Sequence, residues 1–455
     1  MNEMEDDINT RGYELFGQLQ IVKDNSRKVT IEEDDERAKL VGEVCLGTYQ
    51  IAQGENPKYS HQDLLGNAID ITCDIKGMKI GYNETTYKNL IALAIRFLDI
   101  DYFEKYADYQ FIAKHIFDWI VDLYEKNRAE FNLYTYIQNE VEKELNDYTF
   151  YFKVQDLIIQ EEFKVGNATF TFKKADYFEN VFDEMLVGSQ HLKPENKAGF
   201  VDVHKSFLNK VLVCSTVKGV KAKAELIIKK EVELSVNAIK CLLITESLHP
   251  RTELFNVDYL YMNQSMSNYF SITTSAKDFS MHLESKNSPT PITIDKFRLQ
   301  ELTQAGLETF NNFLIHKKNT ELYYRTESQI NLLGEINSTM DLYQRVTKLI
   351  SFFENMIIPV DNYTAKGKTY MKNIISIIVA PNDQQKITTS VFKLYDIRDK
   401  YLHNRNQLPI EHLDLLNVKV LAVLFLLAVV DLNRELNTLE EMQLQFGIEN
   451  KVKQK

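Results

Sequence analysis

The sequence predicts an α+β fold, in which a mixed β-rich and helical N-terminal region precedes a C-terminal all-α bundle. In the N-terminal part, apolar residues alternate with a period of two, which is typical of half-buried strands; beyond about residue 295 helical spacing dominates. The 455 residues include only 16 glycines and 8 prolines, too few for a turn-dense all-β protein.

The length allows about two to four domains, because a domain usually contains roughly 100–200 residues. The changes in periodicity predict three regions. The first is a mixed domain that is β-rich to about residue 82 and then helical, the second is a middle α/β region, and the third is a helical bundle. Their expected bounds are 1–148, 149–300 and 301–445.

Within the first region, the alternation over 13–21 predicts a strand. A hairpin is expected over 69–82, because the alternation resumes at Met78 after a Lys76-Gly77 turn. Helical periodicity follows over 85–146.

The middle region starts with a second predicted hairpin, over 163–172, whose turn is Gly166-Asn167. Residues 180–260 have mostly helical spacing. Strands and polar loops are expected over 268–298, with a linker at 285–293.

Beyond residue 295, five segments have helical spacing, which predicts a bundle of four or five helices. Pro359 ends the second segment, Pro381 follows the third, and Pro409 suits the first turn of the fifth. The segments are 301–317, 339–357, 368–379, 387–402 and 409–435.

The net charge of −12 lies in residues 1–300, because residues 301–455 contain 18 basic and 18 acidic residues. An acidic chain repels nucleic acid as a whole. Residues 312–410 nevertheless contain 13 basic against 9 acidic residues, so this part of the bundle is suited to binding phosphates.

The four cysteines are widely spaced and form no C-x-x-C pair, which excludes a zinc ribbon and suits a reducing compartment. The N-terminus is acidic, unlike a secretory signal. The longest apolar run, Val420–Val430, has eleven residues, whereas a membrane span needs about 20. We therefore expect a soluble cytoplasmic protein with no membrane partner, no metal and no other cofactor.

The candidate chemistry lies in residues 394–405. Arg398 is followed by the polar Asp399, and His403 comes five positions after Arg398. Five residues of an ideal helix turn by about 500°, which leaves the two side chains about 140° apart. They would face one cleft only if the helix ended near Leu402, or if a second copy of the chain completed the cleft.

Arginine and histidine are the residue types that metal-free cleavage of RNA requires. A neutral imidazole takes the proton of a 2′-hydroxyl, and a protonated imidazole gives a proton to the leaving 5′-oxygen. The planar guanidinium binds the phosphate and stabilises the charge that grows in the transition state. A purely structural interpretation is also open: His403 caps the last carbonyls of its helix, and Arg398 pairs with Asp396 or Asp399 on the surface.

Residues 391–405 resemble the R-x4-6-H motif of the HEPN superfamily, in which Arg398 and His403 match the motif and Asp399 matches its polar position. The segment 349–354 resembles the second helix of that family, which often ends in an acidic residue, here Glu354. A long chain with a C-terminal bundle is similar to the Apea-like HEPN proteins of bacterial phage defence. The resemblance covers roughly 305–440, about a third of the chain.

The resemblance implies a metal-independent endoribonuclease that works as a homodimer through its C-terminal bundle. Its products would carry 2′,3′-cyclic phosphate and 5′-hydroxyl ends. The resemblance assigns catalysis to Arg398 and His403, with Asp399, Asn404 and Glu354 in support.

Four basic residues are candidates for binding the RNA phosphates. Lys400 and Arg405 flank the motif, and Lys366 and Lys368 form a basic patch between two expected helices. For Lys366 and Lys368 the alternative is an ordinary solvated loop.

Two functions remain open from the sequence. The first is a nuclease effector of anti-phage defence by abortive infection, or a toxin, whose N-terminal region senses a phage-derived or protein trigger. The second is a non-catalytic module for dimerisation and protein interaction, to which the apolar run Val420–Val430 would contribute an interface.

Overall fold

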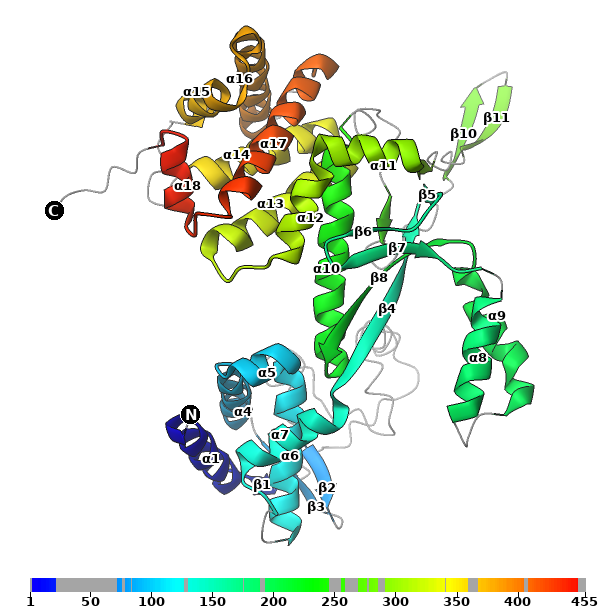
Figure 1. Cartoon of the computed structure of the whole chain (residues 1–455), viewed down its shortest axis with the longest axis vertical. Helices are drawn as coiled ribbons and strands as arrows, with labels where there is room; N and C mark the ends of the chain where they lie inside the picture. The colour runs from blue at the N-terminus through cyan, green and yellow to red at the C-terminus, as the bar shows by residue number, and fades with distance from the viewer. Residues whose placement is uncertain are drawn as a thin grey trace, which may run out of the picture. The chain divides into compact units, whose positions relative to one another are not determined.

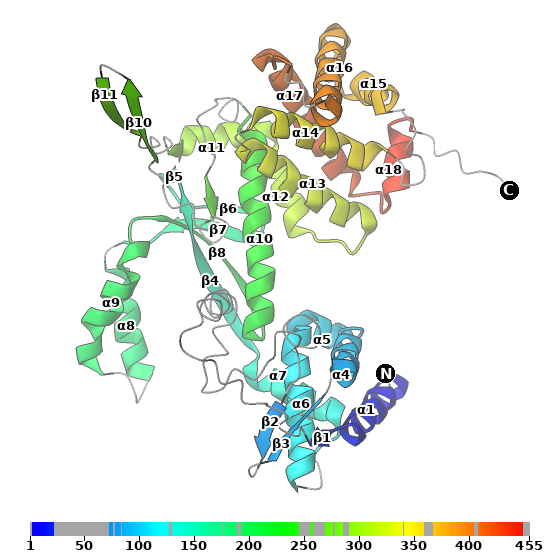
Figure 2. The ribbon, with the colours of Figure 1, turned by 180° about the vertical axis from the view of Figure 1, so that it is seen from behind.

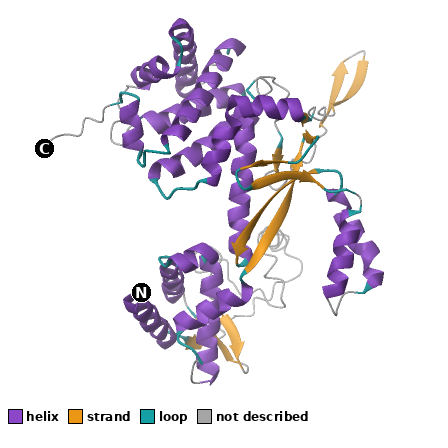
Figure 3. Cartoon of the chain, in the orientation of Figure 1, coloured by secondary structure: helices purple, strands orange, loops and turns teal. Residues whose placement is uncertain are grey.

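The computed structural model (Figures 1 and 2) is an α+β structure, whose helices and strands are distinguished in Figure 3. Two compact units make up the chain, one of Met1–Tyr148 with Lys218–Leu226 and one of Thr149–Val217 with Ile227–Lys455. No boundary between units falls at residue 300. The structure describes residues 2–21, 72–75, 78–82, 84–126, 130–174, 176–188, 193–244, 255–257, 269–275, 278–284, 291–339, 341–358, 367–404 and 408–448.

The first unit combines helices with a small antiparallel sheet. Its strands pair in the order β1-β3-β2 and are β1 (Gln20–Ile21), β2 (Thr72–Ile75) and β3 (Met78–Gly81). The predicted hairpin and the helical stretch that follows it are both confirmed. The helices are α1 (Asn2–Gly17), α4 (Glu84–Phe97), α5 (Asp101–Tyr106), α6 (Tyr109–Lys126) and α7 (Leu133–Glu144).

The prediction of a strand over 13–21 is wrong, because helix α1 occupies residues 13–17 and only the last two residues of the segment belong to a strand, β1. Ile8 and Leu15 are buried two helical turns apart, and Met4 packs against the same core, so the helical period decides the structure. Tyr13, which the alternation placed inside, is 51% exposed. The rest of the β-rich prediction falls mainly on residues 22–71, outside the described residues.

The second unit contains a five-stranded sheet with the order β6-β7-β8-β4-β9. Its strands β6 (Phe163–Val165) and β7 (Ala168–Phe172) form the predicted hairpin, with Gly166 at a φ of 59° in the turn. Parallel strands β5 (Leu157–Ile159) and β12 (Ile292–Ile294) pair separately, as do antiparallel strands β10 (Tyr269–Ser275) and β11 (Asp278–Glu284). The remaining strands of the sheet are β4 (Asn146–Gln155), β8 (Val211–Gly219) and β9 (Asn256–Val257).

The prediction of mostly helix over 180–260 is confirmed only in part, because β8 lies inside it. Residues 211–215 are all buried, since β8 is an inner strand of the sheet, and a continuous apolar run of this length does not distinguish strand from helix. Of the linker expected at 285–293, Ile292 and Thr293 instead belong to β12, and residues 285–290 are not described. The helical elements here are α8 (Tyr177–Gly188), η2 (Pro194–Asn196), α9 (Lys197–His204), η3 (Lys205–Phe207) and α10 (Lys221–Leu242).

Eight α-helices follow β12 in the part of the chain that the structure describes. They include the helices expected near 339–357, 368–379, 387–402 and 409–435, but they outnumber the four or five predicted, because α13 and α18 lie outside the predicted segments and the segment 301–317 is divided. They are α11 (Lys296–Leu302), α12 (Glu308–Ile315), α13 (Glu321–Ser338), α14 (Leu342–Ile357), α15 (Gly367–Ile378), α16 (Pro381–Asn404), α17 (His412–Leu432) and α18 (Leu439–Gln445).

The segment expected as one helix over 301–317 is kinked. A π-helical stretch, Thr303–Leu307, joins α11 to α12, and Gly306 within it has a φ of 122°. Only glycine adopts that conformation without strain. A side chain at Gly306 would also meet Leu427 of α17.

Helix α10, from Ile227 onward, lies between the sheet and the bundle (Figures 1 and 2). Toward the sheet, the Ser235 hydroxyl donates to the Val165 carbonyl at 2.8 Å. Toward the bundle, the Asn337 amide of α13 donates to the Lys240 carbonyl at 2.7 Å. A single hydrophobic core accordingly runs from the sheet into the bundle.

Helix α17 is the central helix of the bundle and packs against α12, α13, α14, α15 and α16. By length and composition alone it is apolar enough to cross a membrane, but 67% of its most apolar window is buried inside the protein, which is typical of a core helix. Lys419 of this helix is buried as well. Its burial, together with the nearby charge of Arg345, lowers the pKa of Lys419 to about 6. The apolar run Val420–Val430 is therefore explained by packing within one chain, and it is no longer an argument for an interface.

Candidate functional site

Helix α16 positions both residues of the candidate motif. Pro381 occupies its first turn, where a missing N–H costs nothing, and Asp383 lies at its positive end. One face is buried at Val391, Leu394 and Tyr395, which anchors the helix in the bundle. The helix begins six residues earlier than predicted and continues two residues past 402, to Asn404.

Arg398 is bound by a carboxylate from another helix. Its two terminal nitrogens donate to the two carboxylate oxygens of Glu354 on α14, at 3.1 and 2.9 Å. The Arg398 Nε also lies 2.9 Å from Asp399 Oδ1, an ion pair without hydrogen-bond geometry. The guanidinium additionally packs on the Tyr395 ring, with its carbon 5.3 Å from the ring centroid.

Burial and charge act in opposite directions at Arg398. The Arg398 side chain is 17% exposed and that of Glu354 is 23% exposed. Burial alone would lower the pKa of Arg398, but the hydrogen bonds and charge of Glu354, helped by Asp399, raise it. Burial, with a smaller contribution from Glu354, also raises the pKa of Tyr395. The arginine is therefore held as a fixed cation and the tyrosine as a neutral phenol.

A third helix closes this cluster. Gly367 begins α15, and a Cβ placed there would lie 3.1 Å from the Tyr395 hydroxyl and 3.7 Å from Glu354 Oε1. Glycine therefore lets α15 approach Tyr395 and Glu354 closely. The arginine cluster (Glu354, Tyr395, Arg398 and Asp399, with Gly367) lies where α14, α15 and α16 meet.

His403 lies apart from this cluster. It is exposed near the end of α16, and because the helix continues to Asn404, His403 and Arg398 point about 140° apart around one axis. The neighbouring Tyr401 stacks on Tyr343 of α14, with ring centroids 5.1 Å apart, so the end of α16 is held against the bundle. One chain therefore does not bring Arg398 and His403 together.

The basic candidates differ in their surroundings. Lys400 is exposed on α16. The Lys368 ammonium donates to Asp396 Oδ1 at 2.6 Å, so the carboxylate of Asp396 neutralises it. Lys366 and Arg405 lie outside the described residues, and Asn404 is the last residue of α16.

The sequence did not point to a polar network that joins α16 to α17. The Asp414 carboxylate on α17 accepts from the buried Ser390 hydroxyl at 2.6 Å and from the Lys393 ammonium at 3.1 Å. The Asn417 amide completes it by donating to Ser390 Oγ at 3.0 Å. These bonds fix the rotation of α16 against α17, and thus the direction in which Arg398 faces.

Among the described residues, no group of three or more histidine, cysteine, aspartate and glutamate side chains is arranged to hold a metal ion. Comparisons with known proteins found no matching family model, no matching curated protein and no matching solved structure. The function is therefore inferred from the residues themselves.

Proposed function

We propose that this chain is a metal-independent endoribonuclease of the HEPN type. The observation that carries the proposal is the arrangement on α16. Arg398 is fixed by Glu354, the acidic residue that the resemblance assigns to the same site, and the helix then continues to an exposed His403. Glu354 uses two of the five N–H donors of the guanidinium, which leaves donors for a phosphate oxygen.

The proposed reaction transfers a phosphoryl group within the RNA. The 2′-oxygen forms a bond to the adjacent phosphorus and loses its proton to a neutral imidazole, while the bond from phosphorus to the 5′-oxygen breaks. The imidazolium formed in this way gives the proton to that 5′-oxygen, so the products carry 2′,3′-cyclic phosphate and 5′-hydroxyl ends. The guanidinium of Arg398 stabilises the charge on the phosphoryl oxygens.

A two-fold homodimer through the bundle would supply the missing geometry. The two side chains diverge on one continuous helix, so Arg398 of one chain would act with His403 of the other. We assign this end of α16 to the dimer, because the exposed His403 would have to meet the Arg398 of the other chain there.

The biological role we propose is that of a cytoplasmic effector in anti-phage defence or a related toxin. The acidic residues 1–300 would act as the sensor or regulator, with a phage-derived or protein trigger. Their charge supports this role, because an acidic partner region competes with RNA phosphates for a locally basic bundle.

A second function has one observation in its favour. Arg398 is 17% exposed and already paired with two carboxylates, as expected of an arginine that only joins helices. On this alternative the bundle is a non-catalytic module for dimerisation and protein interaction.

Cleavage products in the presence of a chelator separate the two functions. We expect the full chain in excess EDTA to cleave single-stranded RNA, to leave 2′,3′-cyclic phosphate and 5′-hydroxyl ends, and to spare DNA, which lacks the attacking hydroxyl. Mass spectrometry of the fragments identifies the ends. Cleavage that needs magnesium, or 3′-hydroxyl and 5′-phosphate ends, would contradict the proposal; no cleavage at all would favour the interaction module.

A further inference from the structure

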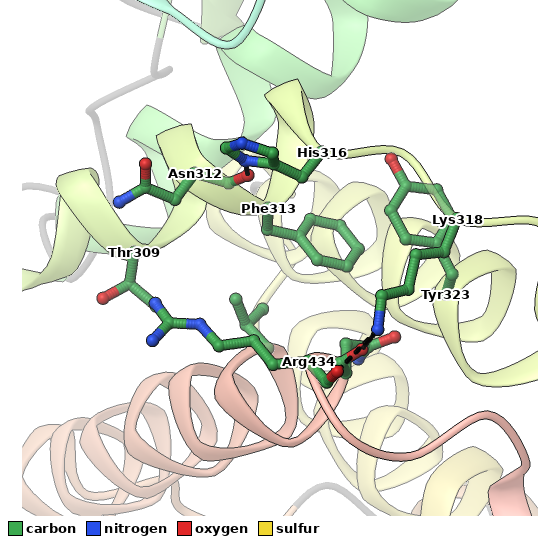
Figure 4. A pocket seen from close by; sticks show the side chains of 9 residues that line it. Thr309, Asn312, Phe313, His316, Lys318, Tyr323 and Arg434 are labelled. Carbon is green, nitrogen blue, oxygen red and sulfur yellow. Dashed lines mark hydrogen bonds between the residues drawn. The ribbon is translucent and has the colours of Figure 1, made fainter.

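A cavity of about 290 Å³ lies away from the arginine cluster, where α12, α13 and the C-terminal end of α17 meet (Figure 4). Its volume is at the lower end of the range for small-molecule pockets. The cavity belongs wholly to the second unit, and neither the proposed reaction nor the proposed dimer uses it.

Two stacked rings form the apolar wall of this cavity. Phe313 of α12 and Tyr323 of α13 lie with ring centroids 4.5 Å apart and an angle of 25° between their planes. Both rings are largely buried, and Val430 of α17 lies beside them in the wall. Figure 4 shows the Phe313 ring pointing into the space between His316 and Arg434. A flat apolar ligand therefore has a rigid surface to pack against.

Three basic residues, His316, Lys318 and Arg434, line the same cavity, and no carboxylate lines it in the described part of the chain. The Lys318 ammonium donates to the carbonyls of Asn433 and Arg434 at 2.6 and 2.7 Å, which fixes this cation at the negative end of α17. A cavity with this lining favours an anion.

The other two basic side chains are available for a ligand. The His316 Nδ1 donates to the Asn312 carbonyl at 2.9 Å, and this bond orients the ring. In the doubly protonated imidazolium, Nε2 carries a second N–H, which is the donor that an anion would accept from. The Arg434 side chain is 67% exposed, and its charge partner Asp431 is 3.5 Å away, a loose surface pair. An anionic group on a ligand would compete with Asp431 for this guanidinium.

A buried acceptor adds a polar contact. The Asn433 amide donates to Thr326 Oγ1 and to the Val429 carbonyl, both at 2.9 Å. Its Oδ1 is buried and accepts no hydrogen bond from the described residues. A buried acceptor without a donor is unfavourable, and a water or a ligand group with an N–H or O–H, rather than the anionic group itself, would satisfy it.

We propose that this cavity binds a small organic anion with a planar apolar body. The body lies against Phe313, and the carboxylate or phosphate of the ligand is bound by Arg434 and His316. Lys318 is a positioning residue that holds the end of α17 against the loop after α12. This inference does not depend on RNA cleavage.

Binding to two probe anions tests the proposal. The probes are 2-naphthoate and 5′-AMP, each compared by saturation-transfer NMR and calorimetry with a neutral counterpart, 2-naphthalenemethanol or adenosine. We expect at least one anion to bind the full chain about tenfold more tightly than its neutral counterpart. A charge-assisted hydrogen bond contributes enough free energy for a difference of this size. Which anion binds distinguishes a carboxylic acid from a nucleotide.

Substitutions of two exposed residues test whether the anion binds in this cavity. Arg434→Gln should weaken binding of the anion about tenfold, to the affinity of its neutral counterpart. His316→Gln should also weaken binding of the anion. Arg325→Gln is the matched control, because Arg325 is a half-exposed arginine of α13 that does not line the cavity. The proposal is overturned if neither anion binds below about 1 mM, if the neutral counterparts bind equally well, or if Arg434→Gln binds like wild type.

Discussion

Arg398→Ala and His403→Ala should each slow RNA cleavage by the full chain by about 10²–10⁴-fold. Removing His403 removes the group that moves the proton, and a positioned acid or base contributes a factor of this size. Removing Arg398 removes the cation that stabilises the phosphoryl charge, and Arg398→Lys should fail as well, because lysine lacks the planar fork. Initial rates on a fluorescent RNA measure the loss.

The two alanine variants should differ in stability, which provides an internal control. His403 is exposed, so its removal should change the free energy of unfolding by no more than about 0.5 kcal/mol. Removal of Arg398 leaves the partly buried Glu354 without its partner and should cost about 1–3 kcal/mol. The control is Arg325→Ala, which changes a half-exposed arginine of α13 and should retain full activity. If folded His403→Ala cleaves like wild type, the histidine takes no part in the chemistry.

Gly334→Ala should destabilise the second unit by about 1–3 kcal/mol, although the change normally favours a helix. In an exposed helix interior it gains about 1 kcal/mol. Gly334, however, lies in α13 directly against α10, where an added Cβ would be 2.6 Å from the Cβ and Cγ of the buried Asn237. The two helices would have to move apart. The free-energy cost of this overpacking exceeds the gain from the higher helix propensity of alanine.

The measurement is thermal unfolding followed by circular dichroism, in which Tm should fall by several degrees. Gly199→Ala is the matched control, because Gly199 lies in helix α9 and an added Cβ there meets nothing within 4 Å. It should leave Tm unchanged or raise it. An increase of Tm for Gly334→Ala would show that α10 and α13 pack less closely than the structure indicates.

Periodicity predicted those elements whose buried residues are apolar. Both hairpins and most helices of the bundle fall in this class. Helix α13 was missed because Thr326, Glu327, Gln329 and Asn337 are buried in it, so its inward face does not look apolar in the sequence. Its N-cap, Thr320, was the available signal. The strand expected over 13–21 failed for the converse reason, because a short alternation coincided with a helical pattern.

The candidate site was predictable only as far as its residue types. The sequence singled out Arg398, His403 and Glu354, and the structure adds that Glu354 and Arg398 are paired. The sequence could not show that Tyr395 and Gly367 complete the cluster, because the contact between them joins two different helices, α15 and α16. The 140° divergence follows from helix geometry, but only the continuation of α16 to Asn404 excludes convergence within one chain.

Mixing the two inactive variants tests most directly whether two chains complete the site. In a heterodimer of Arg398→Ala and His403→Ala chains, one composite site keeps both an intact arginine and an intact histidine, while the other site has neither. After random exchange about half of the dimers are of this kind, so the mixture should recover about a quarter of wild-type RNA cleavage. A mixture as inactive as either variant alone, despite exchange shown by native mass spectrometry, would contradict a site shared between two chains.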